Sequence, residues 1–177
     1  MKLTRAVRYR VEQFLRALTA QRAVSEQRVK RAIEILRPEA RALFVQQAPQ
    51  DQLHALSVYE MLVARGHSNE DLLTAALLHD VGKAASPASP LQRGFFVLAE
   101  RFAPGTLGRL VRARAGNRND ALATYANHAE IGARRADEAG CSTLTVELIR
   151  NHERRLGARR TERDRLLAAL QAADNMS

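Results

Sequence analysis

The chain has 177 residues, of which 46% are hydrophobic and 27% are charged, a length and composition suited to one domain with a substantial core. No uncharged apolar run is long enough to cross a bilayer, and the basic start lacks the apolar core of a signal peptide. The single cysteine, Cys141, excludes an internal disulfide and a cysteine-rich zinc site. These features predict a soluble protein of the reducing cytoplasm.

The net charge of +9 is unevenly distributed. Residues 1–48 hold 11 Lys/Arg against 4 Asp/Glu, whereas residues 49–177 hold 17 against 15. The basic excess is compatible with a contact to nucleic acid or to an anionic membrane surface. We favour the solvated face of Arg-rich helices, because charge bias alone does not identify a ligand. We therefore expect a basic helical extension over 1–48, packed on a domain spanning 49–177.

Apolar residues recur at intervals of three and four along nearly the whole chain, which predicts helices and no strands. In the extension, we expect packing on the domain through Leu3, Val7, Val11, Phe14, Ile33 and Leu36. The predicted helices cover 3–18, 25–36, 38–47, 51–65, a segment opening at 68 that carries His79, 91–102, a short segment from 107, 120–140, 142–155 and 161–177. The expected class is a compact all-α bundle.

Turn and cap residues punctuate these helices. Pro38 suits the first turn of its helix, and Gly66 suits the residue after a helix end. Ser68 followed by Asp71 resembles a capping box, and Ser142 is positioned to cap the helix behind it. The boundaries of the helices are therefore expected near these residues.

Four of the five histidines share an unusual position. By the 3.6-residue period, each lies on the apolar face of its own helix: His54, His79, His128 and His152. His67, in contrast, lies in a turn, and we assign it no role. For one such histidine alone, a hydrogen-bonded core imidazole is the common explanation. Four on separate helices favour a shared cause.

Two aspartates, Asp80 and Asp174, follow the same inward pattern. A carboxylate on an apolar face is costly unless it is paired or bound to a metal. Several titratable groups buried together are explained economically by a metal centre. The sequence therefore predicts that all six side chains converge on one cavity.

The order and wording of these motifs resemble the HD-domain metallophosphohydrolase superfamily. The similar segments are "QLHALSVYEML", "LLHDVGK", "NHAEIGA", "IRNHE" and "LQAADN", which extend over about residues 51–176. The resemblance implies an all-helical domain that holds one or two divalent metal ions. Its one-metal ligands match His54, His79, Asp80 and Asp174, and the two-metal type adds His128 and His152. Because all six are present, the chain resembles the two-metal type.

The adjacent His79 and Asp80 require a particular backbone. They are about 100° apart on an ideal helix, so they converge on one site only where the helix ends, before Gly82. An aspartate there offers two oxygens that can bridge two metal ions. Such a pair of ions can activate a water molecule for attack on phosphorus. Lys83 is either an exposed lysine or a phosphate-binding charge, and the family motif favours the phosphate role.

The expected function is therefore metal-dependent hydrolysis of a phosphoester in a nucleotide or a small phosphorylated metabolite. Nitrogen and oxygen ligands together suit Mn²⁺, Fe²⁺, Co²⁺ or Zn²⁺ better than Mg²⁺. The chain reads "NHERRLGARR" where a cyclic di-GMP hydrolase of the superfamily carries a Gly-Tyr-Pro motif, so that substrate is not supported. An HD-type di-iron oxygenase and a non-catalytic signalling or interaction domain remain as alternatives.

Overall fold

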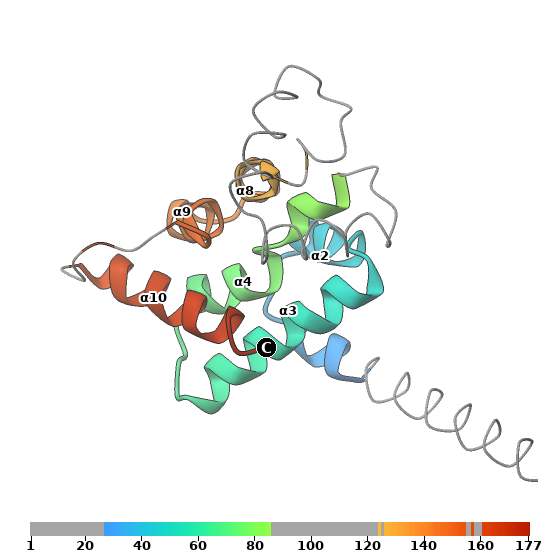
Figure 1. The fold of residues 1–177 in the computed structure, drawn as a ribbon. Helices are drawn as coiled ribbons and strands as arrows, with labels where there is room; N and C mark the ends of the chain where they lie inside the picture. Colours follow the sequence, from blue (N-terminus) through green and yellow to red (C-terminus); the bar gives the residue numbers. More distant parts are fainter. Residues whose placement is uncertain (1–26, 86–123, 125, 155–156, 158–160) are drawn as a thin grey trace, which may run out of the picture.

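The fold of the chain is a bundle of helices (Figure 1). The structure is a computed structural model that describes residues 27–85, 124, 126–154, 157 and 161–177. Throughout these residues the regular elements are helical, and none of them is a strand. The predicted all-α class is therefore confirmed. The helices predicted over 91–102 and from 107 lie outside the described residues.

Seven elements have bounds within the described part of the chain, and a helical segment over 27–33 precedes them. They are α2 (Pro38–Val45), α3 (Pro49–Ala64), α4 (Glu70–Leu78), the 3₁₀ helix η1 (Val81–Ala85), α8 (His128–Glu138), α9 (Thr143–Asn151) and α10 (Glu162–Asp174).

The short helix α4 lies in the middle of the bundle (Figure 1). It packs against α2, α3, α9 and α10. Most of its residues are buried, including Leu72, Leu77 and Leu78, none of which has any exposed surface. This explains why α4 is almost entirely apolar beyond its first turn, since it has partners on several sides. The end of α4 is thereby fixed in the interior of the protein.

Several predicted helix ends are confirmed. Pro38 occupies the first turn of α2, and Gly66 follows α3 with a φ of +83°, which a residue with a side chain rarely adopts. Ser142 caps α9 by accepting a hydrogen bond from the backbone N–H of Thr145. Thr161 starts α10 through a capping box with Asp164.

Other boundaries differ from the prediction. Helix α4 is capped by Asn69, whose side chain accepts from the N–H of Leu72, and not by Ser68. Helix α3 starts at Pro49, two residues before the expected Asp51. The predicted helix over 120–140 is interrupted, because Asn127 lies in a turn and α8 begins only at His128. Helix α9 ends at Asn151, four residues earlier than expected.

Residues of the segment over 27–48, which precedes α3, contribute to the core of the bundle. Leu36 is buried, Ile33 is partly buried against the core, and Phe44 of α2 has no exposed surface. Arg28 forms a two-pronged pair with Glu60 of α3, with N···O distances of 2.7 and 2.6 Å. Leu3, Val7, Val11 and Phe14 lie outside the described residues. Among the residues that are described, no helix is long and apolar enough to span a membrane.

Candidate metal centre

Six side chains from five helices meet around the end of α4. His54 lies on α3, His79 and Asp80 follow the end of α4, and His128 is the first residue of α8. His152 caps the end of α9, and Asp174 is the last residue of α10. These are the six residues selected from the sequence. They form two neighbouring groups, in each of which the three donor atoms lie within 4.8 Å of one another.

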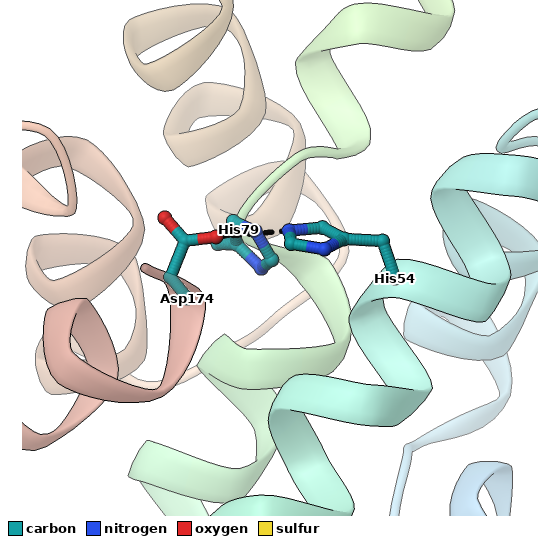
Figure 2. A group of neighbouring side chains, drawn as sticks. All are labelled: His54, His79 and Asp174. Atoms are coloured by element: carbon teal, nitrogen blue, oxygen red, sulfur yellow. Dashed lines mark hydrogen bonds and ion pairs between the residues drawn. The ribbon is translucent and has the colours of Figure 1, made fainter. Parts of the chain in front are cut away.

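The first group consists of His54, His79 and Asp174 (Figure 2). Nε2 of His54 lies 2.8 Å from Oδ1 of Asp174, and Nε2 of His79 lies 3.5 Å from the same oxygen. His79 is completely buried, whereas the side chains of His54 and Asp174 keep 31% and 27% of their surface exposed. This group therefore faces water on one side, where a small solute can enter.

The second group consists of Asp80, His128 and His152, all of them buried. Oδ1 of Asp80 lies 3.3 Å from Nε2 of His128 and 3.8 Å from Nε2 of His152. The two imidazole nitrogens are 3.3 Å apart. Three donor atoms at such separations can surround one ion.

Asp80 connects the two groups. Its Oδ1 faces His128 and His152, while its Oδ2 lies 3.6 Å from Nε2 of His79 in the first group. Two ions held by the two groups could therefore share this carboxylate, as in two-metal sites whose ions are about 4 Å apart.

Two glycines bring the Asp80 turn close to α8. A Cβ added to Gly82 would lie 1.9 Å from the carbonyl oxygen of His128 and 2.8 Å from the backbone nitrogen of Gly132. In turn, a Cβ added to Gly132 would lie 3.2 Å from the backbone nitrogen of Gly82. Arg135 also donates to the carbonyl of Val81 at 3.1 Å. This close backbone packing positions Asp80 beside His128.

The histidine tautomers suit metal coordination. Nδ1 of His79 donates to the carbonyl of Ala76 at 2.9 Å, and Nδ1 of His152 donates to the carbonyl of Ile149 at 2.7 Å. Since a carbonyl can only accept, each neutral ring keeps its lone pair on Nε2, which faces the cluster. Within the described structure, the buried Nε2 of His79 and Oδ1 of Asp80 have no hydrogen-bonding partner. The donor set therefore fits divalent ions.

The charges of the cluster are strongly coupled. Burial opposes protonation of His79, but the carboxylates of Asp80 and Asp174 outweigh it and raise the pKa of His79 to about 9. Burial and the neighbouring His79 cation lower the pKa of His152 to about 3. Burial also works against ionisation of Asp80, yet the adjacent cations, His79 first, hold its pKa well below the usual range. The two carboxylates thus favour a proton on His79, whereas His152 stays neutral.

Two further charged residues touch the cluster. Nζ of Lys83 lies 2.6 Å from Oδ2 of Asp80, with 21% of the lysine side chain exposed. Oε1 of Glu153 lies 3.5 Å from Nε2 of His128, and half of the Glu153 side chain is exposed. Glu153 is not among the six residues that the sequence pattern selects. The available signal was its position directly after His152 in "NHE".

A separate cavity of about 510 Å³ lies between α9 and α10 and contains none of the six side chains. Two of its arginines are paired with carboxylates: Arg150 with Glu130 at 2.9 Å and Arg163 with Glu147 at 3.2 Å. Much of the positive charge in this cavity is therefore already balanced. The unusual chemistry of the described residues is concentrated at the histidine and aspartate cluster.

Comparison with protein families gives one assignment. The model of the HD domain matches residues 52–177, which include all six clustered side chains. The comparison with curated proteins and the comparison with solved structures each gave no match. Since the family model covers most of the chain, the protein belongs to the HD-domain family, whose members are generally metal-dependent hydrolases.

Proposed function

We propose that the protein is a metal-dependent phosphohydrolase that acts on a nucleotide or a small phosphorylated metabolite. The observation that supports this most directly is that Asp80, a donor of the second group, also faces His79 of the first group. Such a shared carboxylate suits hydrolysis of a phosphoester, in which water attacks phosphorus while negative charge accumulates on the phosphoryl oxygens.

His54, His79 and Asp174 would hold one ion, and His128 and His152 would hold the second, with Asp80 between them. When bound, divalent ions there supply Lewis-acid activation of water and neutralise phosphoryl charge. The mixture of imidazole and carboxylate donors favours Mn²⁺, Fe²⁺, Co²⁺ or Zn²⁺ over Mg²⁺, which prefers oxygen donors and retained water.

The chain's own groups prepare the site for an anion. Hydrogen bonds to Ala76 and Ile149 fix the rings of His79 and His152. Lys83 is partly exposed beside Asp80, so its ammonium group can move to a phosphate oxygen that enters from solvent. There it would act as a point charge that stabilises the transition state, an effect commonly worth a few kcal/mol.

One observation also favours a second candidate function. Each group consists of two histidines and one carboxylate, a set that non-haem iron oxygenases use as well. An HD-type di-iron oxygenase would therefore require the same six side chains. The two functions differ in their need for oxygen and in whether phosphate is released.

A screen of the full-length protein separates the two functions. Metal-depleted protein is reloaded with Mn²⁺, Fe²⁺, Co²⁺ or Zn²⁺ and incubated with a panel of nucleotides and phosphorylated metabolites. We expect phosphate release from at least one substrate without oxygen consumption, and its loss in Asp80→Asn. Oxygen-dependent turnover by the iron-loaded protein, with no phosphate released from any member of the panel, would assign the oxygenase function instead.

A further inference from the structure

Glu153 is a carboxylate at the edge of the second donor group. It follows His152 directly, just beyond the end of α9. Its Oε1 lies 3.5 Å from Nε2 of His128, and 50% of its side chain is exposed, while Asp80, His128 and His152 are buried. Glu153 therefore lies between this donor group and solvent.

Around His128, Asp80 and His152 have the spacing of donors to a common ion, and Glu153 lies next to them. From Nε2 of His128, Oδ1 of Asp80 and Nε2 of His152 are each 3.3 Å away, and Oε1 of Glu153 is 3.5 Å away. Two donors that each lie about 2.1 Å from one ion are separated by about 3.0 Å at right angles and about 3.4 Å in a tetrahedron. At 3.5 Å from His128, Glu153 lies just beyond these separations, and it is not one of the three donors that all lie within 4.8 Å of one another. Its half-exposed side chain would therefore have to rotate towards the ion to bind it.

The charge of this group also favours another anionic donor. Of the three donors in this group, only Asp80 is a carboxylate. Its Oδ2 is already paired with Nζ of Lys83 at 2.6 Å. A doubly charged ion in a buried site is stabilised by each additional negative donor, because water is excluded there. The carboxylate of Glu153 would offset the charge that Asp80 alone leaves unbalanced.

We propose that Glu153 is a fourth, exchangeable ligand of the ion held by Asp80, His128 and His152. This inference rests on the metal centre of the proposed function. Since Glu153 reaches the group from the solvent side, it can leave the ion when a substrate oxygen arrives, while the three buried donors stay in place. Of the two groups, the second would therefore be the one that exchanges a protein ligand for substrate.

The test is a titration of the metal-depleted full-length protein with Co²⁺. Calorimetry measures the affinity, and visible absorption reports the number of ligands on the ion. Three variants are compared with the unmodified chain: Glu153→Gln, Glu153→Asp and the control Glu130→Gln. Glu130 lies in the first turn of α8, close to His128 in sequence, and its carboxylate pairs with Arg150. The control thus removes one negative charge near the site without removing a proposed ligand.

We expect Glu153→Gln to weaken one of two Co²⁺ sites by roughly 10–100-fold and to change its absorption spectrum. Glu153→Asp should behave similarly, because the shorter side chain keeps the charge but loses the reach. Glu130→Gln should leave both sites within about threefold. If Glu153→Asp binds both ions normally, or Glu153→Gln resembles the control, Glu153 is not a ligand.

These measurements are independent of catalysis. Weaker binding and an altered spectrum in both Glu153 variants would support the ligand even if the protein released no phosphate from any substrate. Phosphate release with unchanged Co²⁺ binding in those variants would support the proposed function and overturn the role of Glu153.

Discussion

Gly82 and His128 are in backbone contact, and any side chain at Gly82 would collide with α8. The nearest atom to an added Cβ is the carbonyl oxygen of His128 at 1.9 Å, followed by its carbonyl carbon at 2.7 Å. Both are backbone atoms at the start of a helix, so neither can rotate away as a side chain can. The distance between Asp80 and His128 depends on this contact.

Gly82→Ala is therefore expected to separate η1 from α8 and to remove the ion bound by Asp80, His128 and His152. Forcing a methyl group into a packed site commonly costs about 1–3 kcal/mol of folding stability. Thermal denaturation and metal content measure the two effects separately. Gly140→Ala is the matched control: its φ of +71° is strained for alanine, but nothing lies within 4 Å of the added Cβ. It should lower stability and keep both ions.

Asp80→Asn is expected to lower metal content in both groups and to abolish phosphoester hydrolysis. The substitution keeps the size of the side chain but removes the charge that faces His79 on one side and His128 on the other. Elemental analysis and turnover are measured on the same preparation. Asp137→Asn, at an exposed position of α8, serves as the control. Full activity in Asp80→Asn would exclude the bridging role.

Lys83→Met should change metal binding and turnover in opposite directions. The ammonium group of Lys83 competes with ions for Oδ2 of Asp80, at 2.6 Å. Its removal should strengthen metal binding a few-fold and lower turnover by roughly 10²–10³, because the transition state loses a cation. Titration with Mn²⁺ and steady-state kinetics measure these effects. Metal loss in a folded Lys83→Met variant would show that the lysine supports the site structurally.

Metal uptake should depend on pH through His79. With a pKa of about 9, His79 carries a proton at neutral pH in the metal-free protein, and an ion can bind only the neutral ring. Affinity for the ion at His54, His79 and Asp174 should therefore rise about tenfold per pH unit up to about pH 9, and then level off. Calorimetry in two buffers with different ionisation enthalpies measures the proton released. A constant affinity between pH 6.5 and 8.5 would contradict this.

The same raised pKa affects stability of the metal-free protein in the opposite direction. A histidine that binds its proton more tightly when folded contributes stability below its unfolded pKa of 6.5, and this contribution is lost as the pH rises towards 9. Protein treated with chelator should therefore lose stability over this window, whereas ion-loaded protein should gain it. Melting temperatures with and without chelator provide the comparison.

The sequence predicted the features that depend on periodicity. Inward positions at intervals of three and four indicated most of the helices in the described residues and selected all six side chains that the fold brings together. This succeeds because a helix can bury only one face in most settings, so a histidine on that face must lie inside. The order of the histidine and aspartate motifs along the chain then indicated the HD-domain superfamily.

Features that depend on contacts between helices could not be predicted. Ser68 and Asn69 are both good caps, and which of them caps α4 depends on how the chain enters the bundle. Gly82 suggested a turn, but its close approach to His128 involves a partner 46 residues away. Glu153 is half-exposed, so no apolar pattern marks it, and its proximity to His128 follows from how α8 and α9 pack.

The contact between His54 and Asp174 joins residues separated by 120 positions along the chain. Closing so long a loop costs conformational entropy, and the formation of local helices does not offset this cost. This half of the site should consequently form late in folding, after α3 and α10 have docked. An ion present at about 100 times its dissociation constant would stabilise the folded chain by about 2.7 kcal/mol. Metal supply would thus influence how long the protein survives unfolding and proteolysis, apart from any effect on its chemistry.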